Sequence, residues 1–168
     1  MKVEYKIKNI NEIFFYGTID DDDMKSNFTI FPINKFHGGY LKQWLLVQDE
    51  IYDYIDSIEK EYNHVVISGH SLGGGIARIA VIFLQVFYPN ISITLNTYGT
   101  PRSYTWSHRK TLSKLKVECN EYINRGDLIP RIPTLFPFFW LLGSKRKNRI
   151  FKGKPNLNFQ KSHVSYDY

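Results

Sequence analysis

The sequence has a single cysteine, Cys119, among its 168 residues. One cysteine excludes an intrachain disulfide, so the fold does not depend on an oxidising compartment. No apolar run approaches the length of about 18 residues that a membrane-spanning helix needs. Residues 1–11 alternate charged and apolar side chains and predict no secretory signal, so a cytoplasmic location is the default expectation.

The chain carries a formal net charge of +6, and this charge is unevenly distributed along the sequence. No acidic residue lies between Leu128 and Tyr166. The basic residues of this stretch are Arg131, Lys145, Arg146, Lys147, Arg149, Lys152, Lys154 and Lys161. Such asymmetry is compatible with nucleic acid, an anionic membrane or a solvated basic surface. No helix-turn-helix, zinc-finger or RNA-binding motif accompanies it, and we expect no nucleic-acid partner.

The chain does have enough apolar residues for a core, at 43% of the sequence, and its length favours a single domain over residues 1–168. Periodicity predicts strands at 3–7, 12–16, 64–68, 91–98 and 116–124, and helices at 40–62, 72–88 and 103–115. Residues 19–36 lack a clear period and are expected to form a surface loop. Alternating strands and helices predict an α/β fold with a mostly parallel sheet and crossover helices.

A glycine-rich stretch, Gly69-His70-Ser71-Leu72-Gly73, joins a predicted buried strand to a predicted helix. Gly-x-Ser-x-Gly alone is a weak signal, but a serine at the tip of a strand-to-helix turn is typical of a nucleophile elbow. Such a turn needs small residues on both sides, and Gly69 and Gly73 supply them. The patterns of a phosphate loop and of a dinucleotide-binding loop are both absent.

The order of residues along the chain selects a base for Ser71. A serine becomes a strong nucleophile only when a base takes its proton and an acid orients that base. In elbow-containing folds the chain order is Ser, then Asp or Glu, then His. Only His108 and His163 follow Ser71, and no acid lies between Ser71 and His108. His163 is therefore the predicted base.

Three acids lie between Ser71 and His163, namely Glu118, Glu121 and Asp127. Glu118 and Glu121 fall inside a predicted strand. Asp127 follows the end of that strand, where open parallel sheets place functional groups. We therefore predict Asp127 as the residue that orients His163.

A serine nucleophile also needs donors for the oxyanion of its tetrahedral intermediate. The backbone N–H of Leu72, directly after the nucleophile, is the first candidate. The second donor is expected in the loop after an earlier strand, where Gly17-Thr18 stands. We predict the Thr18 backbone N–H as this donor, assisted by its hydroxyl.

These segments resemble the class 3 lipases, the fungal-type triacylglycerol lipase family of α/β-hydrolases. The resemblance runs from about residue 12 to the end of the chain. The segments that carry it are Phe15-Tyr16-Gly17-Thr18, His37-Gly38-Gly39-Tyr40, Gly69-His70-Ser71-Leu72-Gly73-Gly74, Tyr98-Gly99-Thr100-Pro101-Arg102, Asn124-Arg125-Gly126-Asp127-Leu128-Ile129-Pro130 and His163-Val164-Ser165-Tyr166.

The resemblance implies a compact α/β-hydrolase with helices on both faces of the sheet. It also implies hydrolysis of lipid esters by Ser71, Asp127 and His163, without a cofactor or metal. It further implies a flap within residues 19–36. Two features depart from the family: Tyr16 stands where an arginine is usual, and the chain begins almost at the oxyanion strand.

Residues 135–149 combine an apolar run with a basic one. Aromatic anchors next to basic residues suit contact with an anionic membrane or lipid interface. The alternative is that the apolar residues pack in the core or line an acyl pocket.

Two alternatives to a neutral-lipid lipase stay open. The basic C-terminal third favours a phospholipase A1 acting on anionic membranes. The short N-terminus and Tyr16 instead suggest a lipase-like binding protein with an idle site. The sequence leaves open the oligomeric state and the acyl chain preferred.

Overall fold

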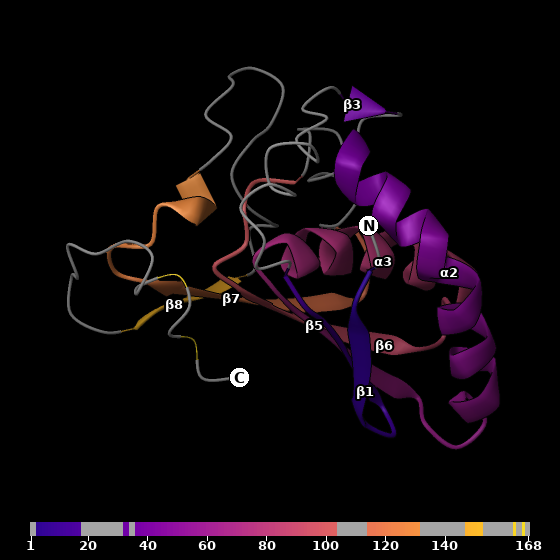
Figure 1. The fold of residues 1–168 in the computed structure, drawn as a ribbon. Coiled ribbons are helices and arrows are strands. Elements are labelled where there is room, and N and C mark those ends of the chain that lie inside the picture. The colour runs from indigo at the N-terminus through magenta and orange to yellow at the C-terminus, as the bar shows by residue number, and fades with distance from the viewer. Residues whose placement is uncertain are drawn as a thin grey trace.

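A six-stranded sheet forms the centre of the computed structural model, which describes residues 3–17, 32–33, 36–103, 114–131, 147–152, 163 and 166 (Figure 1). Its strands are β1 (Tyr5–Asn9), β2 (Glu12–Phe15), β5 (His64–His70), β6 (Ser92–Tyr98), β7 (Val117–Asn124) and β8 (Lys147–Lys152). A separate two-stranded sheet pairs β3 (Pro32–Ile33) with β4 (Phe36–His37).

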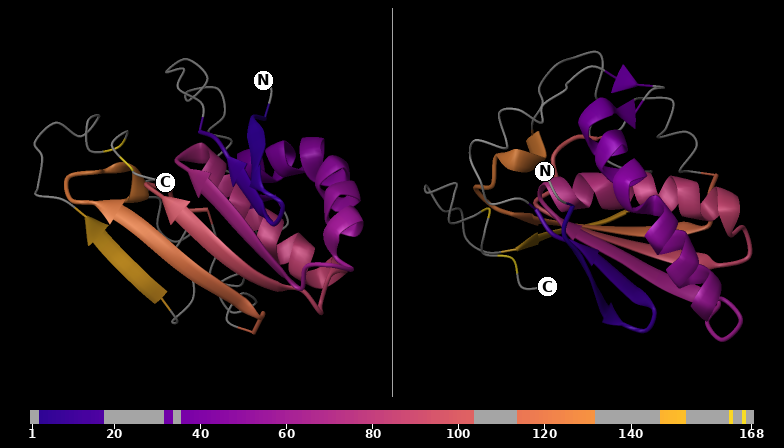
Figure 2. Two further views of the ribbon diagram at one scale, coloured as in Figure 1. Left: turned by 90° about the horizontal axis from the view of Figure 1, so that it is seen from below. Right: turned by 45° about the vertical axis from the view of Figure 1, so that its right-hand side comes forward.

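The order of the strands brings three strand ends to one edge of the sheet. The order is β1-β2-β5-β6-β7-β8, with β1 antiparallel to β2 and every other neighbouring pair parallel. The carboxyl ends of β5, β6 and β7 therefore lie side by side, as the left view of Figure 2 shows. Ser71, Gly99 and Asp127 each follow one of these ends.

Two helices cover one face of the sheet. Helix α3 (Leu72–Phe87) is apolar on nearly every side, and residues such as Ile76 and Ile79 are fully buried between the sheet and α2. Helix α2 (Gly38–Ile58) buries only one stripe, which includes Trp44, Ile51 and Ile55. It packs on the outer side of α3, where the Trp44 ring lies 6.1 Å from the Phe83 ring (Figure 2). This packing holds α3 firmly against the strands.

The strands and helices predicted in the described parts of the chain are found within a few residues of the expected bounds. The predicted helix 103–115 lies almost wholly outside the described residues. The predicted loop at 19–36 also lies mostly outside them, but it contains β3 and the first residue of β4. A further 3-10 turn, η1 (Ile129–Arg131), follows β7.

Strand β8 was not predicted from the sequence. It has the sequence KNRIFK and pairs in parallel with β7, with Asn148 opposite Asn120. Three of its six residues are cationic, so the run does not resemble the β-branched sequences of strands such as β5. Part of the basic segment proposed for membrane contact, residues 147–149, therefore belongs to the sheet; residues 135–146 lie outside the described residues.

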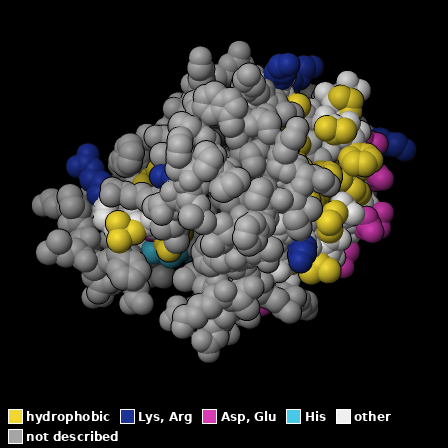
Figure 3. Space-filling view, turned by 90° about the horizontal axis from the view of Figure 1, so that it is seen from above, with side chains coloured by type: hydrophobic (Ala, Val, Ile, Leu, Met, Phe, Trp, Pro, Cys, Tyr) yellow, Lys and Arg dark blue, Asp and Glu magenta, His cyan; other side chains and the backbone are white. Residues whose placement is uncertain are grey.

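The outer surface of α2 mixes apolar and acidic side chains. Leu45 and Leu46 are exposed there, and acidic residues lie beside the apolar ones on the right-hand flank in Figure 3. In the part of the chain that the structure describes, no helix is both long enough and apolar enough to cross a membrane.

Candidate active site

Ser71 lies at the sharp turn between β5 and α3. Its φ of 52° and ψ of −123° place a non-glycine residue in a region that L-amino acids rarely occupy. The surrounding structure must hold this strained conformation in place. The Ser71 backbone N–H donates to the Tyr98 carbonyl at 2.9 Å, and the Ser71 carbonyl accepts from Gly74 N–H at 3.1 Å. The backbone thus makes a sharp, hydrogen-bonded turn from strand to helix at Ser71.

Two glycines allow this turn to fit between its neighbours. A Cβ on Gly69 would lie 2.5 Å from the Gly73 carbonyl oxygen, and a Cβ on Gly73 would collide with the Phe15 carbonyl of β2. Both obstacles are backbone atoms, which cannot move aside as a flexible side chain can. The start of α3 therefore rests directly on β2 and β5, and this contact fixes the position of Ser71.

The structure brings Ser71, His163 and Asp127 together. His163 Nε2 lies 2.9 Å from Ser71 Oγ, and His163 Nδ1 lies 2.9 Å from Asp127 Oδ2. Since a carboxylate can only accept, Nδ1 carries the proton, and Nε2 accepts from the serine hydroxyl. The Asp127 side chain is fully buried, whereas the His163 side chain is 15% exposed. This is the geometry that nucleophilic catalysis by serine requires.

Further hydrogen bonds hold the Asp127 carboxylate. The Ile129 backbone N–H donates to Oδ1 at 2.9 Å, and the Tyr166 hydroxyl donates to Oδ2 at 2.7 Å. The Tyr166 hydroxyl in turn accepts from Asn124 N–H at 2.8 Å. Burial raises the pKa of Tyr166, and the bond to Asp127 raises it further, so the phenol stays a donor. Asp127 is consequently fixed from three directions.

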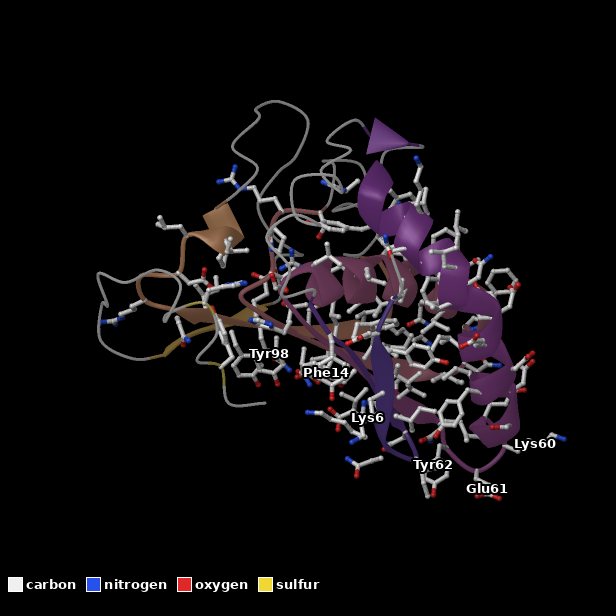
Figure 4. All side chains as sticks on the ribbon, viewed as in Figure 1. Lys6, Phe14, Lys60, Glu61, Tyr62 and Tyr98 are labelled. Carbon is white, nitrogen blue, oxygen red and sulfur yellow. The ribbon has the colours of Figure 1, made fainter. Side chains whose placement is uncertain are left out.

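His70 provides a further contact to His163. Its Nε2–H donates to the His163 backbone carbonyl at 2.9 Å, and the two rings lie 4.8 Å apart. Burial lowers the pKa of His70, so the neutral ring is favoured. The Tyr166 ring packs edge-on against Tyr98, whose side chain is on the lower side of the sheet in Figure 4. The rings of His70 and Tyr166 both lie close to the His163 ring, the Tyr166 ring edge-on at 6.5 Å.

Gly99 packs against the back of the hydrogen-bonded pair. It has a φ of +54°, and a Cβ added to it would lie 2.7 Å from Asp127 Oδ2 and 3.0 Å from His163 Nδ1. A side chain at this position would enter the space between the acid and the base. The end of β6 therefore forms a close-fitting wall behind the site.

Of the two predicted oxyanion donors, one lies in the described residues. Leu72 is the first residue of α3, so its backbone N–H has no acceptor within the helix. Thr18 lies outside the described residues. Its neighbour Gly17 is close to the elbow, since a Cβ on Gly17 would lie 2.9 Å from the Ser71 Cβ.

The two other acids that the sequence offered are used elsewhere or exposed. Glu118 is exposed on β7. Glu121 is buried, and its Oε1 accepts a hydrogen bond from Arg78 Nη2 at 2.7 Å within an ion pair. This ion pair was not predicted from the sequence. The available signal was a single charged residue, Arg78, within an otherwise apolar helix.

In the described part of the chain, no group of His, Cys, Asp or Glu residues is arranged to hold a metal ion. The contacts of the site are instead those of a serine, a histidine and a carboxylate in series. A family model described as Lipase (class 3) matches residues 8–136. The chain belongs to the class 3 lipase family.

Solved lipases share this architecture. The triacylglyceride lipase of Rhizomucor miehei superposes with a TM-score of 0.73 at 21% identity, covering 89% of this chain and 60% of that chain. A triacylglycerol lipase whose catalytic centre is described as a serine protease triad gives a TM-score of 0.71 at 23% identity, covering 83% and 57%. At these identities the likeness establishes the α/β-hydrolase fold.

Curated relatives include phospholipases. Phospholipase A1-Igamma2, a chloroplastic protein of Arabidopsis thaliana, is 29% identical over 107 residues, which is 60% of this chain and 19% of that protein. The chain thus spans about a fifth of the length of this relative and less than two thirds of each of the two solved lipases.

Proposed function

We propose that this chain hydrolyses carboxylic esters of lipids through Ser71, His163 and Asp127. The observation that carries the proposal is the continuous series of hydrogen bonds from Ser71 Oγ through His163 to Asp127, each 2.9 Å long. Membership of the class 3 lipase family supports it. A lipase-like binding protein would have no need of all three groups in this arrangement.

The first half-reaction transfers the acyl group to the serine. As Ser71 Oγ attacks the ester carbonyl carbon, its proton passes to His163 Nε2, and the carbonyl oxygen becomes an oxyanion. The Leu72 N–H, together with a donor from Thr18, stabilises that oxyanion. When the carbon–oxygen bond of the ester breaks, His163 gives its proton to the leaving alcohol. The products are this alcohol and acyl-Ser71.

The second half-reaction releases the acid. His163 takes a proton from water, and the resulting hydroxide attacks the acyl carbon. The bond to Ser71 then breaks, and the proton returns from His163 to Ser71 Oγ. Asp127 stays ionised throughout and stabilises the charged imidazole. The carboxylic acid leaves, and the enzyme is restored without a cofactor.

Hydrolysis of p-nitrophenyl esters of short, medium and long acyl chains tests this proposal. We expect activity that rises with chain length in the wild type and is lost in Ser71→Ala. Ser68→Ala is the matched control, because Ser68 is a buried serine of β5, the strand that precedes Ser71, and its hydroxyl donates to Glu12. If the folded wild type hydrolyses none of these esters and no natural lipid, the result favours a lipase-like binding protein with an idle site.

A phospholipase A1 activity is the second candidate. The similarity to Phospholipase A1-Igamma2 and the absence of acidic residues between Leu128 and Tyr166 favour it. We expect faster fatty-acid release from vesicles of anionic phospholipid than from neutral ones, and suppression of this difference by salt. Equal rates on both vesicles, or preference for a triacylglycerol emulsion, would favour a neutral-lipid lipase.

A further inference from the structure

Arg78 places a buried charge inside the helix that follows the nucleophile. Its side chain is 2% exposed, and that of Glu121 of β7, with which it forms an ion pair, is 4% exposed. Nη2 donates to Glu121 Oε1 at 2.7 Å. Burying two charges costs several kcal/mol per ion, so an apolar pair of similar volume is often at least as stable. Stability alone therefore gives a weak reason for this pair.

The other guanidinium nitrogen binds the chain that follows β6. Arg78 Nη1 donates to the Pro101 carbonyl at 2.9 Å and lies 3.3 Å from Ser103 Oγ. Both partners are buried. A planar guanidinium fixes partners in two directions at once, which a lysine ammonium does with less precision. Arg78 thus ties α3 both to β7 and to the 99–103 segment.

The 99–103 segment leads directly to the acid–base pair. Gly99 lies against Asp127 Oδ2 and His163 Nδ1, and its N–H donates to the Tyr122 carbonyl of β7 at 3.0 Å. Thr100, the next residue in the chain, packs against Gly74 of α3, and a Cβ on Gly74 would collide with the Thr100 side chain. A small displacement of this segment therefore changes the wall behind the Asp127–His163 bond.

We propose that Arg78 and Glu121 form a positioning pair, which aligns Ser71 with His163 and Asp127 by holding α3, β7 and the 99–103 segment in one arrangement. Ser71 precedes α3, Asp127 follows β7, and Gly99 begins the segment, so the pair connects all three supports of the site. Neither residue touches the reacting atoms. The expected effect of this pair on kcat rests on the proposed esterase function.

The test replaces the pair without leaving a buried charge. Arg78→Met alone removes the positive charge next to the buried Glu121 carboxylate and is expected to fold poorly. The double variant Arg78→Met/Glu121→Leu keeps the volume and removes both charges, and Arg78→Lys keeps the charge but loses the planar fork. Leu84→Ala is the control, since Leu84 is a buried α3 residue near the far end of the helix from Ser71.

We expect kcat on a p-nitrophenyl ester to fall about ten- to a hundredfold in the double variant and in Arg78→Lys, with little change in KM. Leu84→Ala should lower the unfolding midpoint but retain kcat well below that midpoint. A kcat in the double variant equal to that of Leu84→Ala would overturn the positioning role and leave the esterase proposal intact.

A second readout does not depend on turnover. The proton shared by His163 Nδ1 and Asp127 can be followed by NMR in each folded protein. We expect its resonance to shift or broaden in the double variant and to stay unchanged in Leu84→Ala. If the wild type hydrolyses no ester, the esterase proposal fails, and this resonance decides the positioning role: a change in the double variant supports it and an unchanged resonance overturns it.

Discussion

Ser71, the strand before it and the helix after it come from one continuous stretch of chain, whereas the acid–base pair that its hydroxyl contacts comes from two distant segments. The first region, the nucleophile region, comprises β5, Ser71 and α3, residues 64–87. The second, the acid–base region, comprises Asp127 after β7 together with His163 and Tyr166. The two regions are therefore held in place by different kinds of contact.

Backbone contacts fix the nucleophile region. Ser71 has a φ of 52°, and Gly69 and Gly73 let α3 lie directly against strand backbones. Buried polar contacts fix the acid–base region, where Asp127 accepts from His163, Tyr166 and Ile129. Substitutions that add volume should therefore disrupt the geometry of the nucleophile region. Substitutions that remove one polar atom should disrupt the geometry of the acid–base region.

The largest expected effect is in the acid–base region. Asp127→Asn should lower kcat by about 10⁴-fold, because an amide no longer stabilises the charged imidazole and can favour the wrong tautomer of His163. Steady-state kinetics on a p-nitrophenyl ester measures the change. Glu118→Gln, an exposed change on β7, is the control and should retain wild-type activity. Equal activity of Asp127→Asn and wild type would remove Asp127 from the mechanism.

A smaller effect on turnover is expected from added volume in the nucleophile region. In Gly73→Ala the new methyl group collides with the Phe15 carbonyl, so α3 must move away from β2. We expect a loss of about 1–3 kcal/mol in the free energy of unfolding. Because Leu72 moves with Gly73, we also expect kcat to fall by about 10²-fold.

Urea unfolding and ester kinetics together measure both effects of Gly73→Ala. Ala80→Gly, at a fully buried position further along α3, costs about 1 kcal/mol in helix propensity in addition to the buried methyl group that it removes, and it should spare kcat. If both variants lose stability but neither loses activity, the close contact with β2 does not position the oxyanion donor.

Tyr166→Phe removes a single oxygen from the acid–base region. It removes the hydroxyl that accepts from the Asn124 N–H and donates to Asp127, both in buried surroundings. We expect a loss of about 1–3 kcal/mol in unfolding free energy and a fall in kcat of about tenfold. Tyr62→Phe, at the far side of the molecule in Figure 4, is the matched control. A Tyr166→Phe variant with unchanged kcat would make this contact purely structural.

The difference between the two regions also explains which features could be predicted from the sequence. The nucleophile region is local, so the β-branched run of β5, the glycines and the apolar α3 predicted the elbow directly. For the acid–base region, residue order left only His163, and position relative to β7 favoured Asp127. Their catalytic roles stay predictions, although the structure brings their side chains together.

Features that depend on pairing across the fold were missed. Nothing in the cationic run 147–152 indicates that it pairs with β7, because that pairing is set by the neighbouring strand. Arg78 and Glu121 are 43 residues apart. Arg78 is unusual as the one charged residue of α3, but nothing in the sequence identifies Glu121 as its partner. Periodicity identifies the elements, but the contacts between distant side chains require the folded structure.

The smallest expected effect concerns His70, which links the two regions by donating from β5 to the His163 carbonyl. Burial lowers the pKa of His70, so the unfolded chain takes up a proton that the folded ring resists. The stability contributed by the neutral His70 ring is therefore fully present above the ordinary histidine pKa of about 6.5 and is lost as the pH falls below it.

The variant His70→Gln tests this contribution, because the amide can still donate a hydrogen bond but does not titrate. We expect its unfolding free energy to lie within about 1 kcal/mol of wild type at pH 7.5, and to fall less than that of wild type between pH 7.5 and 5. Urea unfolding at both pH values measures this difference, and an equal fall in the two proteins would show that His70 does not couple proton uptake to the stability of the site.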